Sequence, residues 1–273
     1  MNPVIYVSTD IKKAYQDYSF LGKIKDRVRI NVEGESFIEE LKLKVARIKL
    51  PPNFNEKAYE RNISVTQKYF RKKSSVIAPK TFRYLDYNLL NDFQKRLFAY
   101  GIINSIKLIL RTSQKSIKSS CIVIFDAEDD INYSIICELA KECGYFILLS
   151  GNLSKTSNLS DYIMANFGVS PIVTSDYNYA MSKADFVISS RNIDVIKPIW
   201  YINNFYLPNT SDAIVVNDIS FAVPWKTDGL EFSFELLGAV LSQMEEKDIE
   251  KALKYNGVYL DRIKFNELTL NNE

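Results

Sequence analysis

The stretch CIVIFDAEDDINYSIICELAKECG, residues 121–144, decides the fold of this chain. Its first part, residues 121–127, is a run of apolar residues that ends in polar ones, which predicts a strand buried on both faces. Residues 132–144 follow with apolar side chains at helical spacing and close on Gly144, a residue that commonly follows the end of a helix. A buried strand followed directly by a helix is typical of parallel sheets, so the stretch predicts a βαβ unit.

The same rhythm continues toward the C-terminus. Further buried strands are predicted at 145–152, 170–174, 185–190, 197–202 and 212–220, helices at 159–168 and 177–184, and a last helix at 231–255. Strands that alternate with helices give right-handed crossovers and a doubly wound layer. We therefore predict an α/β fold whose C-terminal part is a doubly wound, Rossmann-like parallel sheet.

The N-terminal part has a different pattern and predicts a smaller α/β domain. Strands are expected at 3–8, 27–32 and 74–79, and helices at 10–24, 36–48, 55–73 and 88–112. The helix at 36–48 rests on the spacings of Phe37, Leu41, Val45 and Ile48. The polar stretch at 112–120 marks a boundary. This gives a basic domain at 1–115 that ends in a long helix, and an acidic Rossmann-like domain at 116–273.

The charge supports two parts with different surfaces. The chain has 273 residues and a net charge of +2, but residues 1–119 contain 24 Lys+Arg and 11 Asp+Glu, and the rest contains 11 and 22. The basic half could bind an anionic partner such as nucleic acid, could be covered by solvated faces, or could face the acidic half. No nucleic-acid-binding motif accompanies it, which makes nucleic acid the least favoured partner.

Several chemistries are excluded or disfavoured by composition. The chain has no histidine, which removes Ser-His-Asp catalysis and imidazole metal ligands. Its three cysteines form no CxxC motif and are typical of reduced, buried thiols. The N-terminus lacks the pattern of a signal peptide, and no apolar run reaches the length of a membrane span. We expect a cytoplasmic protein with no membrane partner.

Three segments resemble the NAD(P)-binding Rossmann domain of the shikimate dehydrogenase and glutamyl-tRNA reductase group. They are the strand–turn–helix at 121–144, the helix–strand step KADFVISS at 183–190, and VVNDISFAVP at 215–224. The resemblance covers about 40% of the chain and implies a dinucleotide at the first turn. It leads us to expect a relative of NAD(P)-dependent dehydrogenases, or a protein descended from one.

The first turn departs from that family. A glycine-rich loop lets backbone N–H groups approach the diphosphate, whereas residues 126–132 read DAEDDIN, with four carboxylates and no glycine. Every Cβ hinders that approach, and the charges repel a phosphate, so NAD(P) is possible but disfavoured. The acidic residues could cap the helix through Asp129 or Asp130. The alternative interpretation is a divalent-cation or amine site made by Asp126, Asp129 and Asp130, because Asp clusters without histidine suit Mg²⁺ or Ca²⁺.

Polar residues elsewhere at the strand ends are the other candidates for a ligand. Cofactor-binding candidates are Asp126 and Asn132 of the turn, Ser150, Asn152 and Lys155 after the second strand, and Ser189 and Ser190 after the fourth. In NAD enzymes an acidic residue after the second strand binds the ribose, but residues 150–158 contain no acidic residue. Ser150, Asn152 and Lys155 could hold a phosphate instead. A polar loop is the alternative interpretation.

Few residues of this chain match the catalytic residues of the enzymes that it resembles. Glutamyl-tRNA reductases need a nucleophilic cysteine in the N-terminal domain, but the first cysteine here is Cys121, in a core strand. Shikimate dehydrogenases pair a lysine of an N-V-T-x-P-x-K motif with an aspartate, and SVTQK at 64–68 echoes it without the proline. Lys68 and Asp86 are the weak candidates, with a solvated helix residue and a helix cap as their alternatives.

Three functions follow from these observations. The first is a Rossmann-like protein with a degenerate cofactor site, acting as a regulatory or scaffolding protein on a protein or small-molecule ligand. The second is an active NAD(P)- or nucleotide-binding oxidoreductase with an atypical site around Ser150, Ser189, Ser190 and Asn192. The third is nucleic-acid binding through the basic half. The sequence favours the first slightly over the second and places the third well below.

Overall fold

The computed structural model describes residues 1–273 except 70–73, 206–212, 228, 266–267 and 270–273. The chain forms two compact units, each built from two segments. Unit 1 comprises Met1–Leu97 and Ser220–Asp261, and unit 2 comprises Phe98–Ile219 and Arg262–Glu273. This division differs from the continuous domains expected at 1–115 and 116–273, because most of the long helix falls in unit 2 and a C-terminal segment returns to unit 1.

Unit 2 contains a six-stranded sheet. Its strands are β5 (Ile122–Phe125), β6 (Phe146–Leu149), β7 (Ile172–Thr174), β8 (Phe186–Ser189), β9 (Ile199–Tyr201) and β10 (Val215–Val216). They lie in the order β7-β6-β5-β8-β9-β10, and neighbouring strands pair in parallel. Counted along the chain this is the order 3-2-1-4-5-6, the strand order of the Rossmann fold. The predicted doubly wound parallel sheet is confirmed.

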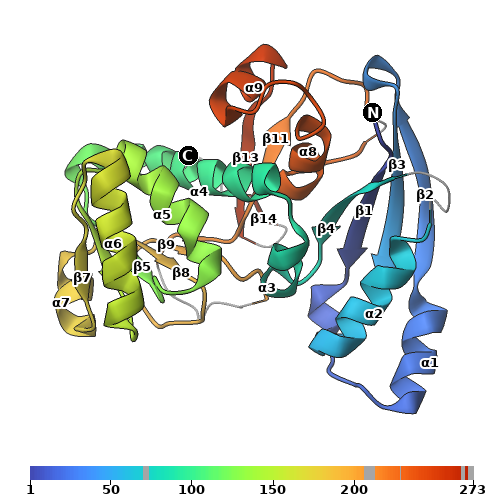
Figure 1. The fold of residues 1–273 in the computed structure, drawn as a ribbon, viewed down its shortest axis with the longest axis horizontal. Coiled ribbons are helices and arrows are strands. Elements are labelled where there is room, and N and C mark those ends of the chain that lie inside the picture. The colour runs from blue at the N-terminus through green and yellow to red at the C-terminus, as the bar shows by residue number, and fades with distance from the viewer. Residues whose placement is uncertain (70–73, 206–212, 228, 266–267, 270–273) are drawn as a thin grey trace. The chain divides into compact units, whose positions relative to one another are not determined.

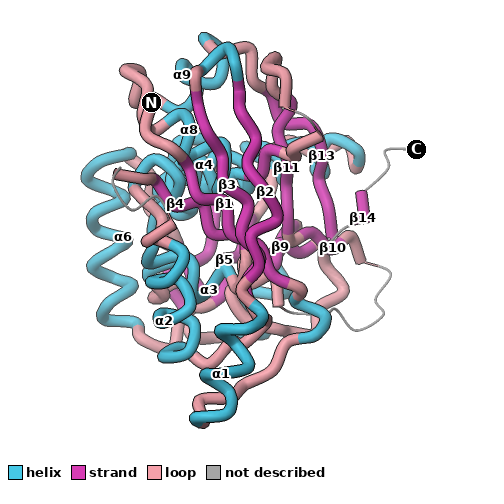
Figure 2. Tube along the Cα trace, turned by 90° about the vertical axis from the view of Figure 1, so that its right-hand side faces the viewer, coloured by secondary structure: helices cyan, strands magenta, loops and turns pink. Residues whose placement is uncertain are grey.

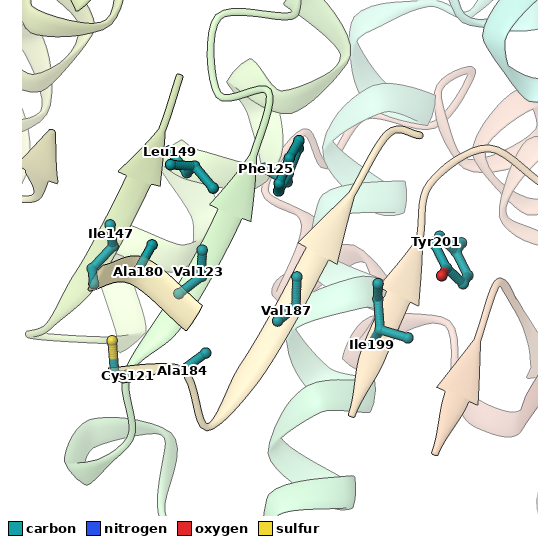
Figure 3. Close-up of a cluster of buried hydrophobic side chains, with 10 residues drawn as sticks. All are labelled: Cys121, Val123, Phe125, Ile147, Leu149, Ala180, Ala184, Val187, Ile199 and Tyr201. Atoms are coloured by element: carbon teal, nitrogen blue, oxygen red, sulfur yellow. The ribbon is translucent and has the colours of Figure 1, made fainter. Parts of the chain in front are cut away.

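Helices cover both faces of this sheet, which is why its strands are apolar throughout. They are α5 (Asp130–Glu142), α6 (Leu153–Phe167), α7 (Tyr177–Lys183) and the part of α4 (Asp92–Thr112) that lies beyond Leu97. Val123, Val187 and Ile199 point to one face, where Ala180 and Ala184 pack against them (Figure 3). On the other face, Trp200 donates its indole N–H to Ser105 Oγ of α4 at 2.9 Å. Alternate residues of each strand thus serve two different cores.

Unit 1 contains a four-stranded sheet in the order β2-β3-β1-β4 (Figures 1 and 2). The strands are β1 (Val4–Thr9), β2 (Asn31–Ile38), β3 (Leu43–Leu50) and β4 (Val76–Lys80). The central β1 runs parallel to β3 and β4, and β2 is antiparallel to β3. The helices are α1 (Phe20–Arg29), α2 (Glu56–Thr66), α3 (Arg83–Asp86), α8 (Phe234–Leu241) and α9 (Ile249–Tyr255). Unit 1 has the α/β character that the sequence predicts for the N-terminal part, but with 139 residues it is slightly larger than unit 2, which has 134, because the segment Ser220–Asp261 joins it.

The remaining elements are short. A third sheet has the order β12-β11-β13-β14, with β11 (Asp218–Ala222), β12 (Phe232–Ser233), β13 (Tyr259–Phe265) and β14 (Leu268–Thr269). Single turns of 3-10 helix occur at η1 (Ile11–Lys13), η2 (Glu39–Leu41), η3 (Tyr87–Leu89) and η4 (Ile117–Ser119). None of the helices in the described ranges has the length and apolar character needed to cross a membrane.

Four of the element predictions are wrong. The helix expected at 36–48 is the end of β2, a turn and β3, because a spacing of four also fits alternate residues of two strands. The helix expected at 10–24 and the strand at 27–32 are replaced by α1, which starts at Phe20 after its N-cap, Ser19. The helix expected at 231–255 is split, since α8 ends at Leu241 and α9 starts at Ile249.

Candidate functional site

The candidate site lies where β5 and β8 are neighbours in the sheet of unit 2. Chain order reverses between these two strands, and in open parallel sheets this switch point is where ligands bind, beyond the carboxyl ends of the strands. Asp126 follows β5 directly, and Ser190 and Arg191 follow β8. The register pairs Phe125 with Ser189, so the residues after them meet at the same edge.

Asp126 has a left-handed backbone conformation, which glycine adopts more readily than other residues. Its φ is +52°, in the left-handed region that costs a residue with a Cβ about 1–2 kcal/mol and that aspartate tolerates better than most. Its carboxylate Oδ2 lies 2.7 Å from Nε of Arg191. Burial raises the pKa of Asp126, and the Arg191 charge partly offsets this. The first position of the turn is therefore occupied by an ion pair.

Arg191 covers the end of β5. Its guanidinium carbon lies 4.6 Å from the centre of the Phe125 ring, a cation–π distance. Its backbone carbonyl accepts a hydrogen bond from Ser189 Oγ at 2.7 Å, which fixes the start of the loop. Arg191 is not among the predicted site residues, because no motif marks it in the sequence. Its position one residue after the predicted Ser189–Ser190 pair is the signal that could have found it.

Asp129 is the N-cap residue of α5, as one interpretation of the turn expected, but its carboxylate does not cap the helix. Its Oδ2 accepts a hydrogen bond from Ser190 Oγ at 2.9 Å, and Asp126 Oδ2 lies 3.5 Å from the same hydroxyl. Ser190 thus joins two carboxylates across the switch point. The space beyond the strand ends is spanned by bonds between the chain's own side chains.

Two more turn residues are engaged in the same way. Glu128 Oε1 accepts from the backbone N–H of Gly151 at 3.1 Å. Burial opposes ionisation of Glu128, yet the hydrogen bonds that its carboxylate accepts leave its pKa below the ordinary value. Asn132 is fully buried and donates its side-chain N–H to the carbonyl of Asp126 at 2.7 Å. These contacts hold the turn against the ends of β5 and β6.

The residues after β6 serve the start of α6. Asn152 is the N-cap, and its side chain accepts from the backbone N–H of Lys155 at 3.1 Å. Ser150 is buried and accepts from Thr156 Oγ1 at 2.6 Å and from the Asn152 N–H at 3.0 Å. Lys155 Nζ lies 2.9 Å from Asp130 Oδ1, in a pair that is largely exposed. The three residues proposed for a phosphate are engaged with one another and with the acidic turn.

The acidic turn does not assemble a metal centre. Among the described residues, no group of three or more Cys, Asp and Glu side chains is arranged to hold a metal ion. The three carboxylates proposed as cation ligands each have a partner, which is Arg191 for Asp126, Ser190 for Asp129 and Lys155 for Asp130.

The weak catalytic candidates lie in unit 1. Lys68 is exposed and lies just after the end of α2. Asp86 is buried, and its carboxylate accepts hydrogen bonds from the Tyr59 hydroxyl, from Thr81 Oγ1 at 2.7 Å and from the Thr81 N–H at 2.7 Å. Burial raises the pKa of Asp86 to about 6. Its bonds tie α2 and α3 to Thr81, the residue that follows β4.

A dinucleotide does not fit this turn as it stands. A diphosphate at the start of α5 would meet four carboxylates and would have to displace the Asp126–Arg191 pair. No glycine allows the backbone to approach it more closely. The cysteines do not offer an alternative nucleophile, because burial raises the pKa of Cys121 to about 11 and raises those of Cys137 and Cys143.

The strand order and the switch point define the class: an α/β protein with a Rossmann-type parallel sheet and an acidic, glycine-free first turn. No protein-family model matches the chain, and no curated protein matches it.

Similar solved structures share little sequence with it. Ornithine transcarbamoylase from Giardia lamblia is 9% identical with a TM-score of 0.40, over 92% of this chain and 85% of that one. 5-ketofructose reductase of Gluconobacter sp. strain CHM43 is 7% identical with a TM-score of 0.41, over 94% and 98%. L-tryptophan dehydrogenase from Nostoc punctiforme is 9% identical with a TM-score of 0.29, over 69% and 56%.

A separate cavity of about 780 Å³ opens in unit 1 and contains none of the predicted site residues. Asn91, Phe93, Arg96, Gln243 and Lys247 are among the residues that line it. The two chain segments that line the cavity are bonded to each other, since the Arg96 guanidinium donates a hydrogen bond to the backbone carbonyl of Lys247 at 3.1 Å. Lys247 in turn donates to the carbonyls of Ser242 and Met244 at 2.8 and 2.6 Å. The cavity is therefore lined by groups that the fold already uses.

Proposed function

We propose that this is a non-catalytic Rossmann-fold protein, regulatory or scaffolding, whose cofactor site has been closed by its own side chains. The observation that supports this most is the Asp126–Arg191 ion pair, joined by Ser190 to Asp129. It occupies the turn at which the fold would admit a diphosphate. The relation to the shikimate dehydrogenase and glutamyl-tRNA reductase group remains part of this proposal, supported by the strand order and by the three resembling segments.

The turn carboxylates already have partners within the chain, which distinguishes the turn from an empty cofactor site. The turn carboxylates have a guanidinium, a hydroxyl, a backbone N–H and an ammonium group as partners. An anion that entered the turn would break these bonds of the protein. It would also lie next to the carboxylates, and each like-charge contact costs about 1 kcal/mol at ~4 Å in water and more when buried. We therefore expect dinucleotide affinity to be weak in either redox state.

Isothermal titration calorimetry with NAD⁺, NADH, NADP⁺ and NADPH tests the proposal. We expect no saturable heat, which corresponds to Kd values weaker than about 1 mM. A dehydrogenase that binds these cofactors, titrated under the same conditions, is the positive control. Micromolar binding of any of them would reject the proposal and favour the oxidoreductase alternative.

A further inference from the structure

Helix α1 of unit 1 exposes its apolar side chains and buries a charged one, the reverse of a helix that packs on a core. Its large apolar side chains point outward: Phe20 and Leu21 are each 76% exposed, Ile24 is 49% exposed and Val28 is 80% exposed. The charged residue Asp26 is fully buried. Proteins rarely bury a charged side chain or expose several large apolar ones together, so this combination is unusual and marks the helix as a candidate interaction surface.

A polar network, not an apolar core, attaches α1 to unit 1. The Asp26 carboxylate accepts hydrogen bonds from Tyr15 at 2.6 Å, Asn53 at 2.9 Å, Asn62 at 3.1 Å and Arg61 at 3.1 Å. Gly22 lies on the same side, where a Cβ would come within 2.6 Å of the Asp17 carboxylate. The helix is thus fixed in the orientation that exposes its apolar side, and a rotation would break the Asp26 network.

The exposed side has basic residues along both margins. At 3.6 residues per turn, Phe20, Leu21, Ile24 and Val28 fall within an arc of about 100°, opposite Gly22 and Asp26. Lys23 and Arg27 flank this arc on one side, and Lys25 and Arg29 flank it on the other. Figures 1 and 2 show α1 at the margin of unit 1, next to α2. We call these four apolar and four basic residues the α1 face.

We infer that the α1 face binds the surface of an anionic lipid membrane, with the helix lying in the plane of the headgroups. A short apolar stripe between two rows of Lys and Arg matches a helix that buries its apolar side at the boundary between headgroups and acyl chains. Lys23 and Arg27 then reach the acidic headgroups on one side. On the other side Lys25 and Arg29 lie over the ring of Tyr15, 4.1 and 5.8 Å from its centre, and add positive charge to the margin. This inference is independent of the proposed function, since it concerns a different unit and a different element.

Two other occupants fit the face less well. A second copy docked symmetrically would bring the four basic residues of each α1 against those of the other, which is unfavourable. A specific protein partner needs about 800 Å² of contact per side, more than one helix of 10 residues supplies. Partition into a lipid surface requires neither a matching partner nor a spanning segment, so the inference revises the expectation of no membrane partner.

Vesicle binding by the full-length protein tests the inference. Co-sedimentation would compare phosphatidylcholine vesicles with vesicles that contain about 30% phosphatidylserine. We expect binding to the anionic vesicles only, weakened by salt because the headgroup attraction is screened. The variant Lys23→Gln/Arg27→Gln should bind about 25-fold more weakly, roughly fivefold for each charge removed. The variant Leu21→Ser/Val28→Ser should lose binding by at least about tenfold, because it removes buried apolar area.

Matched controls keep the result interpretable. Ile196 of unit 2 is 91% exposed, so Ile196→Ser removes an equally exposed apolar side chain elsewhere and should bind like the wild type. Circular dichroism should show unchanged helix content in all variants. Absence of wild-type binding to anionic vesicles at low salt would overturn the inference. So would a wild-type dimer in sedimentation analysis that Leu21→Ser/Val28→Ser abolishes, which would assign the face to a second copy.

Discussion

At the scale of single residues, Asp126 combines a left-handed backbone with a paired carboxylate, and the two contributions can be separated by mutation. Asp126→Gly and Asp126→Ala both remove the ion pair with Arg191, whose side chain is 58% exposed, so that loss should be small. Only glycine relieves the positive φ. We expect the glycine variant to be more stable than the alanine variant by about 1 kcal/mol in urea unfolding. Equal stabilities would show that the turn relaxes when the carboxylate is removed.

Asp86 should make stability fall as pH rises. Its pKa in the folded protein is about 6, raised by burial from 3.8, so the folded state holds this proton more tightly than the unfolded state. Its contribution therefore favours folding below about pH 4 and is lost as pH rises toward 6, an effect of about 3 kcal/mol. In Asp86→Asn this dependence should disappear, which urea unfolding at pH 4.5 and 6.5 measures. An unchanged difference between these two pH values would contradict the assignment.

The sequence could predict some of the site residues but not their pairing. Asp126 and Ser190 were both predicted as ligand candidates at strand ends, and in the structure Ser190 Oγ lies 3.5 Å from Asp126 Oδ2. The partner of Asp126 could not be foreseen, because Arg191 follows a strand in a loop that has no motif. Lys155 was a candidate for a phosphate, with a polar loop as the alternative. In the structure it pairs with Asp130, since an acidic turn attracts a nearby ammonium group.

At the scale of elements, the packing of α8 against α4 can be tested where Gly238 meets Gln94. A Cβ on Gly238 would lie 2.9 Å from the Cα of Gln94, whose side chain donates to the carbonyls of Ile77 and Glu235 at 3.0 and 2.8 Å. We expect Gly238→Ala to cost about 1–3 kcal/mol of unfolding free energy through overpacking. Gly144→Ala is the matched control, because no atom lies within 4 Å of its Cβ position. If Gly238→Ala left the free energy of unfolding unchanged, the two helices would be shown to move apart without cost.

Uniformly apolar strands could be predicted from the sequence, whereas a pair of strands with alternating burial and a polar break between two helices could not. The strands of the unit 2 sheet are apolar along their length, so β5 and β6 could be predicted from composition alone. The segment 36–48 instead turns at Lys42, whose φ is +49°, with no Gly or Asn to mark the turn. The break between α8 and α9 falls in a polar stretch without proline, which helical periodicity does not detect.

At the scale of the whole molecule, the charge asymmetry of the sequence is partly internal. Unit 1 contains 24 Lys+Arg and 19 Asp+Glu, a net of +5, because Ser220–Asp261 adds acidic residues to the basic N-terminal segment. Unit 2 has 11 and 14, a net of −3. Within unit 1, Arg83 pairs with Glu235 at 3.9 Å, with both side chains buried. This observation favours the interpretation that basic and acidic segments face each other within the fold.

The same charge distribution predicts weak binding of nucleic acid. With a net charge of +5 on unit 1, we expect no saturable binding of a DNA oligonucleotide at about 0.15 M salt. Fluorescence anisotropy with single- and double-stranded oligonucleotides measures this. Steeply salt-dependent binding that persists near physiological salt would support the nucleic-acid hypothesis instead.

The discontinuous units predict how fragments behave. Residues 1–115 lack α8, whose eight residues Phe234–Leu241 are all buried in unit 1. We expect this fragment to lose cooperative thermal unfolding, as monitored by circular dichroism, because the apolar surface under α8 would be exposed. A cooperative transition in the fragment would instead support the continuous boundary that the polar stretch at 112–120 suggests.

We propose that the chain's own side chains close the switch point to dinucleotides. A crystal structure of the protein soaked in millimolar NADPH would test this. We expect an intact Asp126–Arg191 pair, Ser190 bonded to Asp129, and no diphosphate density at residues 126–132. Diphosphate density at the start of α5, with Arg191 moved away from Asp126, would contradict it.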